Sequence, residues 1–224
     1  MKTTFAALVL IGGASLLFAQ DRFDFKVRNY FFTGFAGDQA SLDKGMKICE
    51  DSLAADPKNA EALVWHGAGL FYESGQAFQK QDMQKGGELW ARGLKEMDDA
   101  VALAPDQLGV VIPRGAVLLT ASKYVPNPEM ARPLLETGVA DFEKVYQLQA
   151  QYLDKMGTHP RGELMIGLAD GYNRLGNQEK AQEWFERIQK TMPGTVYEKS
   201  AKTWLETKSL APAHSGCLGC HTGN

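Results

Sequence analysis

The chain has 224 residues, with 24 Lys or Arg and 27 Asp or Glu, so its formal net charge at pH 7 is −3. This slightly acidic balance argues against binding to nucleic acid, which requires a basic face, and against a polybasic membrane-surface patch. The length favours one domain with a substantial core. The three cysteines are an odd number and are unevenly spaced, which does not fit a disulfide framework.

Residues 1–19 have the pattern of a secretory signal peptide. Lys2 gives a basic start, an apolar run extends from Phe5 to Phe18, and Ala19 is a small residue at the expected cleavage site. The apolar run is shorter than the roughly 20 residues that a membrane-spanning helix needs. We therefore expect export to the periplasm or cell envelope, with no membrane span after cleavage.

The following residues, 20–210, predict an all-α domain, because apolar residues recur at helical spacing without strand-like alternation. We expect four helical hairpins over residues 22–191. The second hairpin begins with a helix that ends at Gly75 and continues with a long helix that stops before Pro105. The third hairpin lies between residues 106 and 152, and its register is loose.

The most regular unit spans residues 165–193. Its first helix ends near Gly176, Asn177 is placed to cap the second helix, and Pro193 ends that helix. A closing helix follows, in which Thr195 and Glu198 form a capping box. The apolar stripe of the closing helix comprises Tyr197, Ala201, Trp204 and Leu205.

The unit at residues 165–193 resembles the tetratricopeptide repeat (TPR) family. The matching positions are Met165, Leu168, Ala169 in place of the usual glycine, Tyr172, Ala181, Phe185 and Pro193. The resemblance implies antiparallel helical hairpins stacked as an α-solenoid, with the closing helix as a C-terminal cap. It also implies a concave groove that binds a peptide or protein partner. The groove would be lined by residues around Asn29, Trp65, His66, Tyr72 and Arg174.

The sequence gives little indication of catalysis. We found no Gly-rich phosphate loop, and no grouping of Ser, His and an acid could be assigned. We therefore expect a protein that is not an enzyme. His66 and His159 are isolated histidines with an ordinary structural role as the default, and Cys49 falls on a buried stripe as an inert thiol.

The segment "CLGCH", Cys217 to His221, matches the attachment signature of c-type haem. Cys217 and Cys220 are spaced to add to the two vinyl groups of one haem, and His221 follows directly as the axial iron ligand. We expect residues 211–224 to be a flexible tail that carries one covalent haem c. The resemblance to c-type cytochromes implies haem attachment outside the cytoplasm.

Two other interpretations of the tail remain open. Cys217 and Cys220 could form a redox dithiol, although no thioredoxin-like strand and helix accompany them. His214, Cys217, Cys220 and His221 could instead ligate zinc, although adjacent Cys220 and His221 would both have to face one ion. In the haem interpretation the second axial ligand is not assigned. The candidates are His214, His66, His159 and the methionines, and an open or water-bound position is a further alternative.

The sequence therefore predicts an exported monohaem c-type cytochrome on a TPR scaffold, transferring single electrons within a protein assembly. Its partner would be a redox protein or an envelope protein held in the groove, and self-assembly is compatible with this role. The alternative is a non-redox TPR binding module of the cell envelope with a structural or metal-binding tail.

Overall fold

The computed structural model describes residues 22–210, and over this range it contains nine α-helices, one short 3-10 helix and no strand. The expected all-α fold is thus confirmed for the described residues. The elements are α1 (Phe23–Phe35), α2 (Gln39–Ala55), α3 (Ala60–Gln79), α4 (Met83–Leu103), α5 (Leu108–Ala121), α6 (Pro128–Gln149), η1 (Ala150–Lys155), α7 (Thr158–Arg174), α8 (Gln178–Thr191) and α9 (Val196–Thr207).

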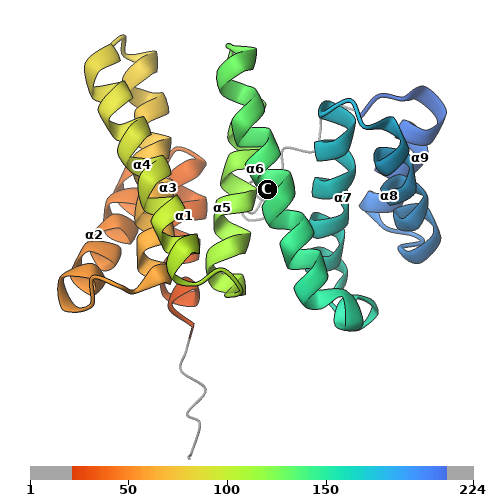
Figure 1. Ribbon diagram of the computed structural model, residues 1–224, viewed down its shortest axis with the longest axis horizontal. Coiled ribbons are helices and arrows are strands. Elements are labelled where there is room, and N and C mark those ends of the chain that lie inside the picture. Colours follow the sequence, from red (N-terminus) through yellow and green to blue (C-terminus); the bar gives the residue numbers. More distant parts are fainter. Residues whose placement is uncertain (1–21, 211–224) are drawn as a thin grey trace, which may run out of the picture.

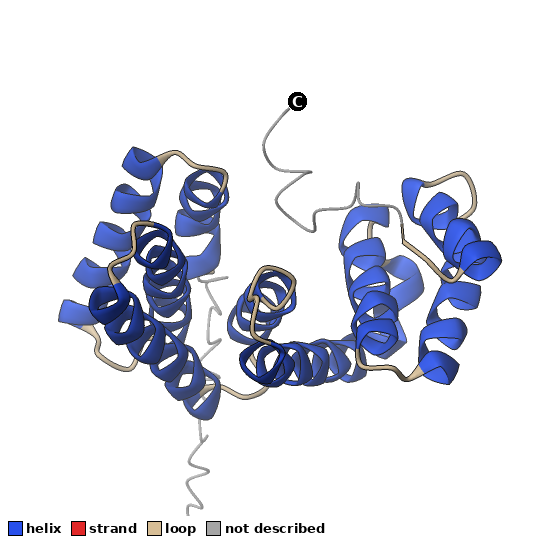
Figure 2. Ribbon diagram, turned by 90° about the horizontal axis from the view of Figure 1, so that it is seen from above, coloured by secondary structure: helices blue, strands red, loops and turns tan. Residues whose placement is uncertain are grey.

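Consecutive helices pack in pairs along the chain. α1 packs on α2, α3 on α4, α5 on α6 and α7 on α8, and α9 covers α8 at the end of the row. Figure 1 shows the pairs side by side in chain order, and the view from above shows that the row is curved (Figure 2). No helix between residues 22 and 210 is both long and apolar enough to cross a membrane.

Two hydrophobic cores fill the row, and the α5–α6 pair contributes to both. The first core lies among α1 to α4 and includes Leu118 of α5, whereas the second lies among α7 to α9 and includes the adjacent Leu119. Neighbouring residues on a helix point about 100° apart, so α5 is buried on two sides. This explains why its sequence shows no single apolar stripe and why the register of this pair was loose.

Helices α3 and α4 approach so closely that two glycines face each other. A Cβ atom on Gly67 would lie 2.8 Å from the carbonyl oxygen of Gly93, and one on Gly93 would lie 2.7 Å from the oxygen of Gly67. Backbone atoms on both sides leave no room to relax, so these positions accept only glycine without movement of the helices.

The predicted caps at the C-terminal end are confirmed. The side chain of Asn177 accepts a hydrogen bond from the backbone N–H of Lys180, and that of Thr195 accepts one from Glu198. Glu198 reaches back to the backbone N–H of Gly194 at 2.7 Å, one residue earlier than the usual capping box would place the bond.

The sequence predicted that the first helix of the second hairpin ends at Gly75, and this prediction was wrong. α3 continues through Gly75 to Gln79, and the extra residues of this hairpin lengthen both of its helices. Gly75 costs a helix about 1 kcal/mol relative to alanine. One turn later Phe78 packs against Trp90 and over Gly86 of α4, and this tertiary contact favours the longer helix.

Candidate functional site

The predicted haem-attachment residues lie outside the described range. Cys217, Cys220 and His221, together with His214, fall within residues 211–224. The described chain ends at Leu210, which packs against the second core beside α9. The two other histidine candidates for the axial ligand, His66 and His159, are described, and their surroundings differ sharply.

His66 lies near the middle of α3 with its side chain only 5% exposed. Its Nδ1 atom is 2.5 Å from Oε2 of Glu96 on α4, and the second carboxylate oxygen of Glu96 accepts a hydrogen bond from Nε of Arg92 at 2.8 Å. Burial by itself would raise the pKa of Glu96, but the hydrogen bonds and charges of His66 and Arg92 outweigh it and lower that pKa. His66 is therefore held in a buried pair that joins α3 to α4.

This pair borders a groove of about 510 Å³ between α2, α3 and α4. The lining combines apolar, acidic and basic side chains: Asp43, Met46, Lys47, Glu50, Leu53, His66, Leu70, Glu73, Arg92 and Glu96. Burial raises the pKa of Glu73, since the neighbouring lysine Lys85 only partly offsets it. Four of the lining side chains are carboxylates and two are basic, Lys47 and Arg92, so the groove is acidic overall.

Of the five residues expected to line a groove, only His66 lies on this one. Trp65 is 4% exposed, and its ring packs against Phe31 at 5.0 Å and Phe32 at 5.9 Å between ring centroids. Trp65 is therefore a core residue, because the inward stripe of α3 faces α1. This corrects the expectation that Trp65 lines the groove. The side chain of Arg174 is also engaged within the protein, because its guanidinium donates a hydrogen bond to the carbonyl oxygen of Leu119.

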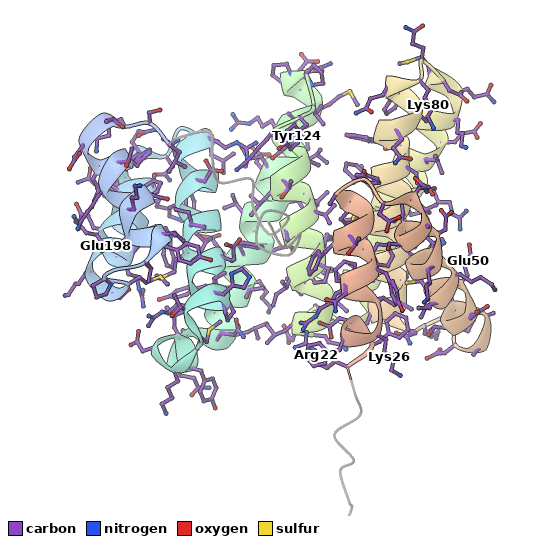
Figure 3. All side chains as sticks on the ribbon, turned by 180° about the vertical axis from the view of Figure 1, so that it is seen from behind. Arg22, Lys26, Glu50, Lys80, Tyr124 and Glu198 are labelled. Atoms are coloured by element: carbon purple, nitrogen blue, oxygen red, sulfur yellow. The ribbon has the colours of Figure 1, made fainter. Side chains whose placement is uncertain are left out.

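His159 lies at the start of α7 with its side chain 44% exposed. Its Nδ1 atom is 3.1 Å from the hydroxyl oxygen of Tyr197, the second residue of α9. The same hydroxyl donates to Oε1 of Glu163 at 2.7 Å. We refer to His159, Glu163 and Tyr197 as the α7–α9 cluster. Glu198, labelled in Figure 3, follows Tyr197 and marks this end of the molecule.

Comparison with known proteins adds no assignment, since no family model, curated protein or solved structure matches this chain. Within residues 22–210, no group of three or more His, Cys, Asp or Glu side chains is arranged to hold a metal ion. Cys49 is a free, fully buried thiol whose pKa is raised by burial, as expected for an inert core residue.

Sequence reasoning identified the two histidines but missed their partners. Glu96 is thirty residues from His66, and nothing in a dispersed set of acidic residues distinguishes it. Glu163 could have been found, because it lies four residues after His159 on one face of α7. Tyr197 was predicted on the buried stripe of α9, but the role of its hydroxyl depends on how α9 crosses α7.

Proposed function

We propose that this protein is an exported monohaem c-type cytochrome that transfers single electrons within a protein assembly. The observation that carries the proposal is the motif Cys217-Leu218-Gly219-Cys220-His221. The signal-like segment 1–19 supports it, because c-type haem is attached after export. The folded part contributes a scaffold and not a reaction centre, so we propose no enzymatic activity.

The donor set of the motif fits the attachment of one haem. Cys217 and Cys220 would form the two thioether bonds, and the imidazole of His221 would bind the iron on one face. Bound in this way, the haem supplies one-electron oxidation and reduction. The chain's own part is to hold the group covalently in a segment with little apolar mass and to keep it beside the helical array.

We further propose that the helical array is TPR-like and serves as the partner-binding scaffold. Four helical pairs followed by a covering helix support this, as do small residues where paired helices meet. Ala169 of α7 and Ala181 of α8 are both fully buried in the second core, at the positions where the repeat pattern requires small side chains. A protein partner held by this array would meet a haem that is already nearby.

Haem attachment is tested by producing the chain in a host with haem-attachment machinery. We expect the purified protein to carry one haem that survives acid extraction, shown by the visible spectrum and intact mass. The double substitution Cys217→Ala, Cys220→Ala should abolish it. Cys49→Ala is the matched control, since it removes the third thiol from the core and should leave the haem content unchanged.

The same measurement separates the alternatives. A colourless protein with one zinc ion per chain would support the non-redox binding module with a metal site at His214, Cys217, Cys220 and His221. A colourless, metal-free protein in which Cys217 and Cys220 reversibly lose two protons and two electrons to an added oxidant, forming a disulfide, would support a dithiol. Either result would refute the cytochrome.

A further inference from the structure

The groove between α2, α3 and α4 has an apolar floor. Met46 of α2 and Leu70 of α3 line it, and they are only 8% and 5% exposed because both belong to the first core. Leu53 of α2 is a further apolar lining residue and is partly buried. A ligand in the groove therefore meets apolar side chains as well as charged ones, which favours a ligand with an aliphatic part.

The two basic side chains of the lining are already engaged by carboxylates of their own helices. The ammonium of Lys47 pairs with Asp51, one turn further along α2. The Nε atom of Arg92 donates to Glu96, one turn further along α4, at 2.8 Å. Neither cation is therefore left to neutralise the remaining carboxylates of the groove.

These remaining carboxylates, Asp43, Glu50 and Glu73, form no ion pair with any residue between 22 and 210. Asp43 and Glu50 (labelled in Figure 3) are seven residues apart, which places them on one face of α2 about 10 Å apart along its axis. Burial raises the pKa of Glu73 on α3, and the charges of Asp43 and Glu50 raise it further. Lys85 opposes this effect without contacting Glu73. The groove thus has mutually repelling negative charges on α2 and α3.

The imidazole of His66 adds a hydrogen-bond acceptor to the α3 side of the groove. His66 precedes Glu73 by seven residues on the same face of α3, and its side chain is 5% exposed. Because Glu96 is ionised, the Nδ1–H of His66 donates to it. The Nε2 atom has no hydrogen-bond partner among the described residues and is not one of the unpartnered polar atoms sealed from solvent. In the neutral imidazole, Nε2 carries a lone pair that can accept from an N–H of a ligand.

The side chain of a lysine or arginine fits this combination. Its aliphatic stem can lie on the apolar floor while its charged head donates hydrogen bonds to carboxylates and to the imidazole. A bare metal ion does not fit, because no group of three or more ligating side chains within residues 22–210 is arranged to hold one. Lysines three residues apart in an extended chain are about 10 Å apart, which matches the spacing of Asp43 and Glu50.

We infer that this groove binds an extended lysine- or arginine-rich segment of a protein partner, with Asp43, Glu50 and Glu73 as the partners of its cationic side chains. The inference rests on the proposed role of the array in binding a protein partner, and it does not require the haem. The groove differs from the one that the TPR resemblance implies, since only His66 is common to both.

The experiment measures binding of a fluorescein-labelled peptide to the purified full-length protein by fluorescence anisotropy. The probe has three Lys-Gly-Ser repeats followed by a further lysine, and a second probe has glutamine in place of every lysine. We expect saturable binding of one lysine probe per chain, which weakens as NaCl rises from about 20 mM to about 200 mM. The glutamine probe should not bind.

The triple substitution Asp43→Asn, Glu50→Gln, Glu73→Gln should weaken binding of the lysine probe about tenfold, as expected for the loss of three partly exposed charge pairs. The matched control is Glu183→Gln, Glu186→Gln, Glu206→Gln, which removes the same charge from exposed positions of α8 and α9 and should change the affinity less than about twofold. Far-UV circular dichroism verifies that both triple variants keep the helical content of the wild type.

Three outcomes would overturn the inference. These are no binding of the lysine probe, equal weakening in the two triple variants, and displacement of the probe by spermidine at or below the concentration of unlabelled peptide that displaces it. The last result would assign the groove to free polyamines. Each outcome leaves the cytochrome assignment standing, because the haem is measured separately by the visible spectrum, and a chain without haem would leave the binding test valid.

Discussion

Several polar side chains in this protein are buried between helices, and each depends on particular partners. Glu61, at the start of α3, is 5% exposed and joins three elements. One carboxylate oxygen accepts from the backbone N–H of Asp24 at 2.9 Å, and the other accepts from Nε2 of Gln107 at 2.7 Å. A single carboxylate thus ties the beginnings of α1 and α5 to α3.

The Glu96 carboxylate leads to a prediction of pH dependence. Its pKa is below the ordinary glutamate value of 4.5, because His66 and Arg92 together outweigh the effect of burial. The folded state therefore binds the proton less tightly than the unfolded state. The ionised Glu96 carboxylate therefore stabilises the folded state above pH 4.5, and this stabilisation is lost as the pH falls through the lowered pKa.

We expect Glu96→Gln to unfold more easily than the wild type at pH 7, with the difference shrinking steadily below pH 4.5. Urea unfolding at a series of pH values measures this, with the exposed carboxylate variant Glu88→Gln as a control that shows no such trend. A Glu96→Gln difference that stays constant down to pH 3 would show that the carboxylate's charge does not stabilise the pair.

At the scale of helices, the closest contact is the crossing of α3 and α4 at Gly67 and Gly93. Alanine favours a helix over glycine by about 1 kcal/mol. At Gly93, however, the added methyl group would meet the backbone of α3, with the nitrogen of Phe71 2.7 Å away. Overpacking against atoms that cannot move costs about 1–3 kcal/mol, which exceeds the gain in helix propensity.

We therefore predict that Gly93→Ala lowers the free energy of unfolding by about 2 kcal/mol. Gly87→Ala is the matched control on the same helix, because no atom lies within 4 Å of its added Cβ. It should raise the free energy of unfolding by about 0.5–1 kcal/mol. Chemical denaturation of the two variants shows whether their free energies of unfolding change in opposite directions. Equal changes would mean that α3 and α4 can separate without cost.

At the scale of the whole molecule, the two cores share the α5–α6 pair. Leu118 faces the first core and Leu119 the second, so loss of α5 would expose both. A row of helical pairs can also unfold from one end, because each pair contacts only its neighbours. The shared pair favours one cooperative unit.

Hydrogen exchange measures this cooperativity. We expect the most protected amides of α3 and of α8 to open with the same free energy, equal to that of global unfolding. Leu119→Ala should lower the free energies of both helices together, by about 2–4 kcal/mol. Two distinct values that respond separately would instead define two folding units joined at α5.

A second prediction at this scale concerns the tail. Deleting residues 211–224 should change the free energy of unfolding by less than about 0.5 kcal/mol relative to the haem-free full chain, because residues 22–210 by themselves form two hydrophobic cores. Far-UV circular dichroism and urea unfolding of the two chains provide the comparison. Loss of the cooperative transition would show that the tail contributes to the core.

The sequence by itself determined the features that depend on near neighbours in the chain. The caps at Asn177 and Thr195 use bonds that span three residues, and the apolar stripes of α8 and α9 follow helical periodicity, so both were predictable. The haem motif is also local, since its chemistry depends on the spacing of Cys217, Cys220 and His221 within five residues. It stays a prediction from sequence alone.

Only the tertiary structure decided what depends on how helices cross. It placed Trp65 in the core, extended α3 beyond Gly75 and buried α5 on two sides. It also distinguished two histidines that look alike in sequence, pairing His66 with Glu96 in the interior and His159 with Tyr197 at the surface. The physical reason is that burial and hydrogen-bond partners come from residues about thirty or more positions away, whose approach is set by packing and not by local pattern.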